Sequence, residues 1–363
     1  MSQTEHPLKG KKVVIVGGAG FIGHNMALTM KNLGVDVAVV DSLGVNNYYA
    51  IERERYTNPN GELYLNFIKQ RMNMLHHARI PFIEIDARDY HGLSETMEDL
   101  NPEYIVHLAA VAHANRSNKD PYSTFDHSLR TLENALDVAR STRLNVKRFV
   151  FFSSSMVYGT FADGIVDETT ACNPMGIYGA LKFAGEKMVI AYNQVFQLPY
   201  TIIRPSALYG ERCVSRRVGQ ALIENALRGN TLTINGDGSD RLDFTYIQDL
   251  VGGVIAALSS EKAANEVFNL TYGQGRSLNE MVGIIREHFP EVEVKHQPRD
   301  ALMPERGTLC VDKAKDLIGY TPSWPLDRGF VDYINWYKSN WDELNATAEE
   351  AGPVVYLRRR AWA

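Results

Sequence analysis

The strongest constraint on the fold is an alternation of short apolar runs and helical stretches within the first 150 residues. The runs are rich in Val, Ile and aromatic residues and read KKVVIVG, VDVAVVD, PFIEIDARD, YIVHLAA and KRFVFFS. Strands that alternate with helices in this way form a parallel sheet with helices on both faces. We therefore predict an α/β fold built on a doubly wound parallel sheet.

A glycine-rich turn follows the first of these runs. In VVIVGGAGFIGHNMAL, Gly17, Gly20 and Gly23 stand three residues apart, between a β-branched strand and a helix that Gly34 can end. Glycines here let the backbone pass close to a pyrophosphate, whose charge is met by the N-terminus of the helix. The strand before and the helix after favour a dinucleotide site over a purely structural turn.

The choice between NAD and NADP depends on Asp41, which ends VDVAVVD 24 residues after Gly17. A carboxylate at this point accepts hydrogen bonds from a ribose 2′-OH and repels a 2′-phosphate, and no arginine follows it immediately. We expect NAD as the cofactor; the alternative is that Asp41 only caps its strand.

Two further strand ends suit the same ligand. Asp86 and Ala87 follow PFIEI, where an acid can reach the adenine amino group, and Leu108, Ala109 and Ala110 end YIVHLAA, where small residues let a dinucleotide lie across the sheet edge. The alternatives are that the acid caps a helix and that the small residues serve a close helix contact.

The pair Tyr178 and Lys182 lies in NPMGIYGALKFAGEKMVIAY, a predicted helix that Asn173-Pro174 precedes. Four-residue spacing places the phenol and the ammonium on one helical face. A neighbouring cation favours the phenolate and lowers its pKa from about 10, so the tyrosine can act as a general base. Such a pair is common by chance on solvated helices, but the glycine motif upstream and the serine-rich strand end FFSSSMVYG favour a catalytic role.

The chain as a whole resembles the extended short-chain dehydrogenase/reductase superfamily, and within it the NAD-dependent nucleotide-sugar epimerases and dehydratases. The resemblance covers roughly residues 11 to 340 and rests on GGAGFIG, HLAA, SSSMVYG, YGALK, RPSALYG, RLDFTYIQDL and KAKDLIGYTP. It implies that the Tyr178 phenolate takes a proton from a sugar hydroxyl, that Lys182 holds the nicotinamide ribose, and that Ser154 bonds to the reacting hydroxyl. The residues that we expect to contact NAD are Gly17, Gly20, Phe21, Ile22, Gly23, Asp41, Asp86, Ala87, Leu108, Ala109, Ala110, Tyr178, Lys182 and Pro205.

The resemblance also bears on the type of reaction. Ser155 and Met156 stand where dehydratases similar to this chain carry an Asp and a Glu. Dehydration requires one group that protonates the departing hydroxyl and another that removes the neighbouring proton, and a hydroxyl and a thioether cannot supply that pair. The alternative is that an acid elsewhere in the chain takes this role.

The substrate residues implied by the resemblance are Ser154, Ser155, Arg241 and Arg299, the arginines being similar to those that hold the diphosphate of a nucleotide-sugar. A planar guanidinium suits this task because it meets two phosphate oxygens at once. Arg306 is a competing candidate. Ala207 stands where the family has an asparagine that commonly touches substrate.

Two further features carry expectations about partners. DSLGVNNYY resembles the DxLNxYY of nucleotide-activated uronic-acid 4-epimerases, which hints at a UDP-sugar. Members of the family commonly dimerise through helices corresponding to residues 131–140 and 178–192. We expect a homodimer; the alternative is that the apolar stripe on the first helix packs on the sheet. That stripe consists of Leu132, Ala135, Leu136 and Ala139.

Composition excludes several classes. The formal net charge is −5 and no basic run exceeds three residues, which disfavours nucleic acid as a partner. Three well-separated cysteines fit neither a zinc site nor a disulfide framework, so we expect no metal. The sequence contains neither a signal-peptide pattern nor an apolar run long enough for a membrane span, and we expect a cytoplasmic protein without membrane contact.

We predict a Rossmann-type NAD-binding domain over residues 1–205 and about 243–271, a smaller mixed α/β substrate-binding lobe over 206–242 and 272–345, and a tail over 346–363. The leading hypothesis is an NAD-dependent nucleotide-sugar epimerase that transiently oxidises a sugar hydroxyl, at C4 of a UDP-sugar. The alternatives are a dehydratase, decarboxylase or oxidoreductase on the same substrates, and a non-catalytic NAD-binding regulator.

Overall fold

A seven-stranded parallel sheet forms the centre of the molecule. The structure is a computed structural model and describes residues 5–111, 114–300 and 302–346. The strand order is β12-β7-β5-β4-β1-β2-β3, with every neighbouring pair parallel, so the predicted α/β fold class is confirmed. The strands are β1 (Lys12–Val16), β2 (Asp36–Asp41), β3 (Phe82–Glu84), β4 (Tyr104–His107), β5 (Arg148–Phe152), β7 (Tyr200–Arg204) and β12 (Glu266–Asn269).

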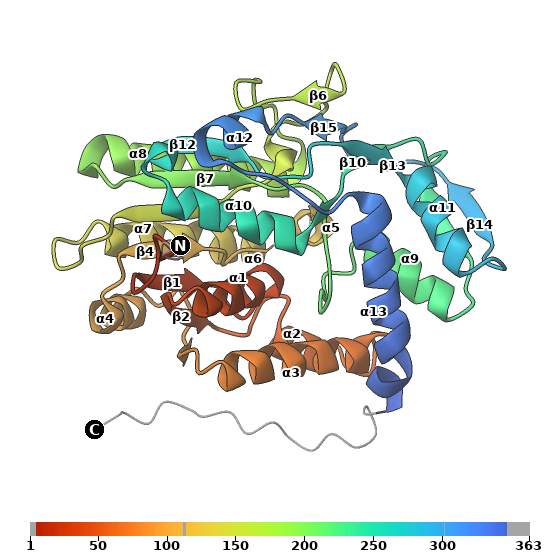
Figure 1. The fold of residues 1–363 in the computed structure, drawn as a ribbon, viewed down its shortest axis with the longest axis horizontal. Coiled ribbons are helices and arrows are strands. Elements are labelled where there is room, and N and C mark those ends of the chain that lie inside the picture. Colours follow the sequence, from red (N-terminus) through yellow and green to blue (C-terminus); the bar gives the residue numbers. More distant parts are fainter. Residues whose placement is uncertain (1–4, 112–113, 301, 347–363) are drawn as a thin grey trace.

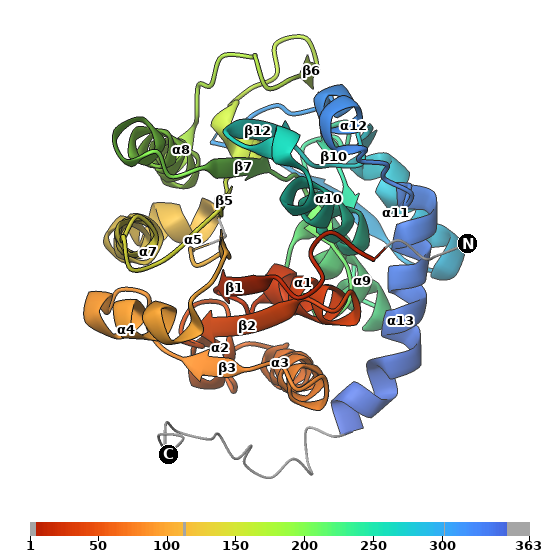
Figure 2. The same ribbon diagram turned by 60° about the vertical axis from the view of Figure 1, so that its left-hand side comes forward.

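Helices cover both faces of this sheet, as Figure 2 shows. One face carries α4 (Tyr90–Leu100), α7 (Thr131–Ala139) and α8 (Gly176–Phe196), and the other carries α1 (Phe21–Asn32), α3 (Gly61–His77) and α10 (Ile247–Ser259). Consecutive strand residues point to opposite faces: Val13 and Ile15 belong to one buried cluster, and Val14 and Val16 belong to the other. Burial on both faces explains why these strands read as unbroken apolar runs.

A smaller lobe is built from later segments and lies beside the sheet (Figure 1). It pairs β9 with β14 in parallel and β10 with β13 in antiparallel register, so it is a mixed α/β unit. Its elements are α9 (Val218–Leu227), β9 (Leu232–Asn235), β10 (Arg241–Asp243), β13 (Gly275–Ser277), α11 (Leu278–His288) and β14 (Val294–Gln297).

Short elements and one long helix complete the described chain. The two-stranded pairs β11·β8 and β15·β6 are parallel, and α13 runs along the outside of the molecule past α11, α9 and α3 (Figure 1). These elements are α2 (Tyr48–Arg53), α5 (Ala114–Lys119), α6 (Pro121–Phe125), the π-helical turn η1 (Asp126–Arg130), η2 (Ser155–Val157), β6 (Ile165–Val166), β8 (Leu208–Tyr209), β11 (Thr245–Tyr246), η3 (Glu261–Ala263), β15 (Thr308–Leu309), α12 (Asp312–Ile318) and α13 (Leu326–Ala346).

The long connection after β2 folds into two helices, α2 and α3, and packs against the body of the protein. Phe67 of α3 lies 5.0 Å from the ring of Trp336 and 5.9 Å from the ring of Tyr337, both on α13. The stretch NFIKQRMNMLHHA lies within α3, apart from its final alanine, which follows the helix. Its packing fixes α3 at the side of the cofactor cavity described below.

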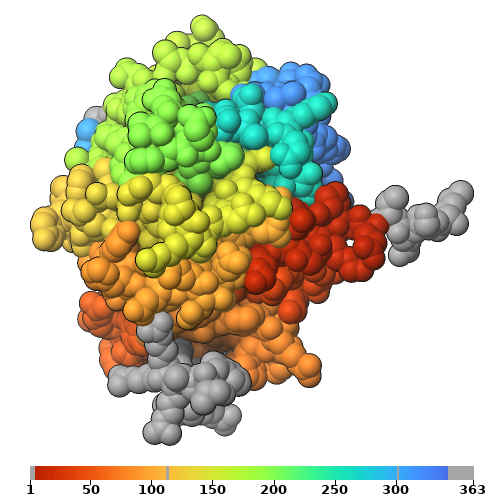
Figure 3. Space-filling view, turned by 90° about the vertical axis from the view of Figure 1, so that its left-hand side faces the viewer, coloured from red at the N-terminus to blue at the C-terminus, as the bar shows by residue number. Residues whose placement is uncertain are grey.

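The apolar stripe predicted to join two copies is buried inside the single chain. Leu132, Ala135, Leu136 and Ala139 are at most 3% exposed and belong to the cluster between α7, α8 and the sheet. Figure 3 shows the outer face of these helices, with α8 above α7. The stripe therefore packs on the sheet, and it offers no surface to a partner. No helix in the described ranges is long and apolar enough to cross a membrane.

Candidate active site

The glycine-rich loop is a tight turn between β1 and α1. Gly17 has a φ of +83°, and a Cβ there would come 2.7 Å from the backbone nitrogen of Ala109. A Cβ on Gly23 would come 2.4 Å from the Cα of Gly18. The first turn of α1 follows at once, and its N–H groups have no acceptor within the helix. This cradle fits a pyrophosphate, and any larger side chain would fill it.

One cavity collects all the residues predicted to contact the cofactor. It lies across the carboxyl ends of the strands, where open α/β sheets bind ligands. The predicted residues that line it are Gly17, Gly20, Phe21, Ile22, Gly23, Asp41, Asp86, Ala87, Leu108, Ala109, Ala110, Tyr178, Lys182 and Pro205.

Asp41 ends β2 and is held by backbone groups. Its Oδ2 accepts a hydrogen bond from the N–H of Ala19 at 3.0 Å, and its Oδ1 accepts one from the N–H of Leu43 at 2.7 Å. Burial raises the pKa of Asp41 to about 6, although these bonds oppose the rise. The carboxylate is therefore fixed in orientation at the edge of the cavity, and it is mostly ionised at pH 7.

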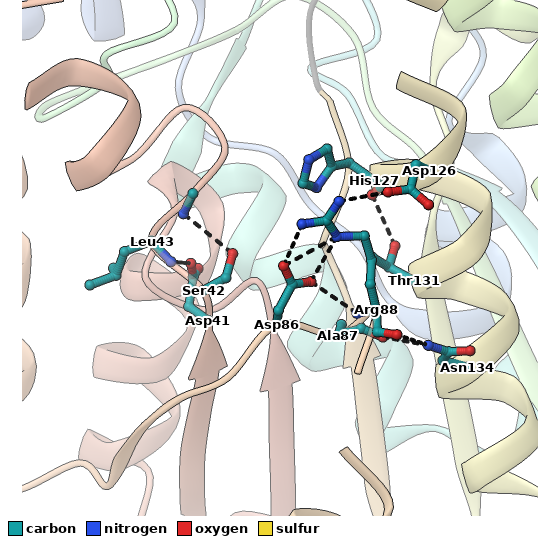
Figure 4. A network of polar contacts seen from close by, with 11 residues as sticks. Asp41, Ser42, Leu43, Asp86, Ala87, Arg88, Asp126, His127, Thr131 and Asn134 are labelled. Carbon is teal, nitrogen blue, oxygen red and sulfur yellow. Dashed lines mark hydrogen bonds and ion pairs between the residues drawn. The ribbon is translucent and has the colours of Figure 1, made fainter. Parts of the chain in front are cut away.

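Asp86 lines the same cavity but is tied to a basic neighbour (Figure 4). Arg88 donates from Nη2 to Asp86 Oδ2 at 2.7 Å and from Nη1 to Asp126 Oδ2 at 2.6 Å. Partial burial alone would raise the pKa of Asp86, but the bonds and charge of Arg88 outweigh it and lower that pKa. Asp86 is therefore an ionised acceptor in a network that also positions Asp126 on the neighbouring π-helical turn.

A buried arginine that the sequence did not point to also lines this cavity. Arg71, on α3, is 0% exposed and donates from Nε to the carbonyl oxygen of Arg212 at 3.0 Å. Its Nη1 has no hydrogen-bond partner among the described residues. A buried guanidinium without an anion is unfavourable, and a phosphate group in the cavity would supply the missing acceptor. Nothing in the local sequence marks Arg71, because its direction depends on how α3 packs.

Ser154, Tyr178 and Lys182 come together beside the cofactor cavity. Tyr178 and Lys182 lie one turn apart on α8, and Ser154 follows β5, where its Oγ accepts from the N–H of Met156 at 3.2 Å. Lys182 is buried, and its ammonium donates to the carbonyl oxygen of Phe152 at 2.6 Å. The three side chains that sequence reasoning grouped therefore share one site.

The electrostatics of Tyr178 differ from the expectation. Burial raises the pKa of its phenol, and the groups that oppose this rise are Arg217, a hydrogen bond with Ser154, and Arg306, without a contribution from Lys182. Lys182 is itself desolvated, which lowers its pKa to about 8. The expected lowering of the phenol pKa is therefore wrong, since desolvation outweighs the nearby cations and raises that pKa.

A buried ion pair supports the catalytic helix from behind. Glu186 follows Lys182 by one turn on α8 and is 2% exposed. Its Oε1 accepts from Arg204 Nε at 2.9 Å, its Oε2 accepts from Arg204 Nη2 at 2.7 Å, and Ser153 donates its hydroxyl to the same carboxylate. Arg204 also donates to the hydroxyl of Tyr158 at 2.9 Å. This network links α8 to the ends of β5 and β7.

A second cavity, of about 440 Å³, opens beside the first and fits a ligand of nucleotide-sugar size. It is lined by Ser154, Ser155, Arg241 and Arg299, the four residues expected to contact substrate. Arg241 donates to the carbonyl oxygen of Gly275, and Arg299 donates to Asp240 at 3.0 Å.

Three more lining residues bear on specificity. Arg306, the alternative to Arg299 as a diphosphate-binding residue, lines the same cavity. Arg217, which the sequence did not point to, lines it as well. Ala207 also lines it and has a φ of +35°, a backbone region that asparagine tolerates better than alanine. The departure from the family's asparagine therefore falls inside the substrate cavity.

Acidic groups are scarce in this second cavity. Among the described residues that line it, the acids are Asp240, which pairs with Arg299, and the exposed Asp300. Ser155 and Met156 are both buried beside Ser154 in the short helix η2 and line the cavity. A carboxylate pair suited to elimination is therefore missing from the described surroundings of Tyr178.

Comparison with known proteins assigns the chain to a family. The fold and the site define a dinucleotide-dependent enzyme with a Ser, Tyr and Lys constellation, and residues 13–271 match the model of the NAD dependent epimerase/dehydratase family. The chain belongs to this family, whose cofactor is NAD.

Three similar proteins illustrate its range. A putative UDP-glucose 4-epimerase of Methanocaldococcus jannaschii is 30% identical over 90% of this chain and 99% of its own length. The crystal structure of a UDP-glucuronic acid 4-epimerase from Bacillus cereus, in complex with UDP-glucuronic acid and NAD, is 25% identical with a TM-score of 0.80, covering 90% of this chain and 99% of that one. A dTDP-glucose 4,6-dehydratase of Xanthomonas campestris is 24% identical over 90% of this chain and 93% of its own length.

Proposed function

We propose that the protein is a nucleotide-sugar epimerase that inverts C4 of a UDP-sugar through transient oxidation. The observation that carries the proposal is the composition of the substrate cavity: Ser154 and Tyr178 line it together with the cofactor cavity, and its two acids among the described residues are Asp240, which pairs with Arg299, and the exposed Asp300. Proton transfer at one hydroxyl is therefore available, and elimination of water lacks its catalytic groups.

Each residue of the site has a definite task in this reaction. The Ser154 hydroxyl bonds to the reacting sugar oxygen, and the Tyr178 phenolate takes the proton of that hydroxyl and later returns it. Lys182 holds the nicotinamide ribose, and the carboxylate of Asp41 holds the adenosine ribose. Bound NAD would accept the hydride and later donate it back. Arg241 and Arg299 hold the diphosphate while the keto sugar rotates in the cavity and presents its other face.

The charges around Tyr178 support its role as a base. Arg217, Ser154 and Arg306 all stabilise the phenolate, and they oppose the effect of burial on its pKa. Ser154, Tyr178 and Lys182 all line the cofactor cavity, which argues against a regulator that only binds NAD. The choice of UDP rests on the similarity to UDP-sugar 4-epimerases.

A screen of nucleotide-sugars tests the proposal. The NAD-loaded protein is incubated separately with UDP-, dTDP-, GDP- and CDP-sugars, hexuronates included, and the products are resolved by NMR. We expect a C4 epimer from one or more UDP-sugars. A 4-keto-6-deoxy product from any of these substrates would mean that the protein is a dehydratase. The expected homodimer, for which the buried stripe on α7 gives no support, is tested separately by light scattering.

A further inference from the structure

The cofactor cavity and the substrate cavity meet at four residues. Ser154, Tyr178, Leu208 and Arg217 line both of them. The sugar carbon that exchanges hydride must lie at this junction, since only there can it approach both the cofactor and the phenol. Arg217 therefore stands at the sugar end of the substrate cavity, and the diphosphate candidates Arg241 and Arg299 line the substrate cavity alone.

The substrate cavity carries more positive charge than a diphosphate needs. Five arginines line it: Arg216, Arg217, Arg241, Arg299 and Arg306. Of these, Arg299 alone makes an ion pair with a residue in the described ranges, its partner being Asp240. A nucleoside diphosphate esterified to a sugar brings two negative charges, which Arg241 and Arg299 are placed to meet. Arg217 and Arg306 are then left without a phosphate partner.

Arg306 is the clearest sign of a missing partner. Its Nε is buried and makes no hydrogen bond to any described residue. Burial and the charge of Arg217 lower the pKa of Arg306 to about 10, and Asp240 only partly offsets this. A guanidinium in this position is costly to the protein alone, and an anionic ligand group would satisfy it.

Arg217 and Arg306 act at one place. Both stabilise the phenolate of Tyr178, and the charge of Arg217 lowers the pKa of Arg306. The charge of Arg299 also lowers the pKa of Arg306, and both side chains line the substrate cavity. The two side chains thus line the substrate cavity near the phenol of Tyr178, where the reacting hydroxyl must lie.

We propose that the sugar of the substrate carries a carboxylate, as a hexuronic acid does, and that Arg217 and Arg306 bind it. The inference rests on the proposed function, because a carboxylate on C5 of the ring lies next to C4, the carbon placed at Tyr178. A guanidinium pairs with a carboxylate through two parallel hydrogen bonds, so two arginines would fix the ring orientation as well as its charge. A neutral hexose leaves both cations unpaired.

Binding in a variant without turnover separates this inference from the proposed function. The Kd values of UDP-glucuronate, UDP-galacturonate, UDP-glucose and UDP are measured by calorimetry on NAD-loaded Tyr178→Phe protein. We expect the uronates to bind at least about 30-fold more tightly than UDP-glucose. Removing one partner of a buried charge pair costs about 2 kcal/mol or more, and about 2 kcal/mol corresponds to this ratio of Kd values. Equal affinities would overturn the inference. Tight uronate binding without epimerisation by the wild type would overturn the proposed function and leave the carboxylate site in place.

Substitutions then assign the site. In the Tyr178→Phe background, Arg217→Gln and Arg306→Gln should each weaken uronate binding by about 30-fold or more, with less than about 3-fold change for UDP. Arg217→Lys should recover part of the loss because it keeps the charge. Arg286→Gln, on the exposed side of α11 and away from both cavities, is the matched control. An equal loss for UDP and for the uronates would show that these arginines bind the diphosphate, and the inference would be wrong.

Discussion

Replacement of Glu186 by glutamine tests the ion pair behind the catalytic helix. Glu186 and Arg204 are 2% and 5% exposed, and two hydrogen bonds of 2.9 and 2.7 Å join them. Glutamine keeps one acceptor oxygen, but its amide group faces the Nη2 donor of Arg204, and the arginine loses its counter-charge. Breaking a buried pair in this way costs about 3 to 5 kcal/mol of unfolding free energy.

Urea unfolding followed by circular dichroism measures this loss. The matched control is Glu133→Gln, which removes a carboxylate from the pair with Arg130, where both side chains are about half exposed. An exposed pair contributes about 0 to 1 kcal/mol. A further variant, Glu186→Gln with Arg204→Met, should be at least as stable as Glu186→Gln alone, because it removes the unpaired buried charge. If Glu186→Gln costs no more than Glu133→Gln, the reasoning about this pair is wrong.

The same substitution has a readout at the active site. The charge of Glu186 raises the pKa of Lys182, while burial lowers it to about 8. Lysine is charged below its pKa, so without Glu186 the ammonium is lost at a lower pH. The NAD affinity of Glu186→Gln should therefore decline at a lower pH than that of the wild type, and Glu133→Gln should leave the profile unchanged.

Four other predictions follow from the site. Arg71→Met should weaken NAD binding by about 10- to 100-fold in calorimetry, because a charged hydrogen bond contributes about 1.5 to 3 kcal/mol, and an unchanged Kd would exclude Arg71 from the cofactor site. NAD should bind more tightly than NADP at matched salt, since Asp41 repels a 2′-phosphate; equal affinities would contradict that role. Tyr178→Phe should lower turnover by about 10² to 10⁴ with NAD binding retained, and near-normal activity would refute its assignment as the base. Between pH 7 and 9 the wild-type affinity for NAD should fall by up to about 10-fold as Lys182 loses its proton, and a flat profile would show that its charge is not used.

Local motifs were enough to predict the parts of the site that local chemistry determines. The glycine loop, Asp41 and the pair on α8 each depend on spacing within one strand, turn or helix, and the structure brings them to a single cavity. The same holds for the sheet, because unbroken apolar runs that alternate with helices restrict the topology to a few choices.

The features that the sequence did not predict depend on packing between segments that are far apart in the chain. Arg71 reaches the cofactor cavity only because α3 is held against α13 by Phe67 and its aromatic neighbours. The pKa of Tyr178 is raised because the elements packed around its phenol desolvate it, and the local sequence does not show which elements these are. The position of Glu186, one turn after Lys182 on α8, is visible in the sequence, but its pairing with Arg204 at the end of β7 is not.

Oxidation and return of hydride at C4 without elimination is tested most directly by the fate of the C5 hydrogen. The NAD-loaded enzyme is incubated in deuterated water with the UDP-sugar that it converts, and the product is examined by NMR and mass spectrometry. We predict a product that is inverted at C4, carries no deuterium bound to carbon and retains its C5 hydrogen. A product with deuterium at C5 that has also lost water would contradict the account, because it requires the acid and base that Ser155 and Met156 cannot provide.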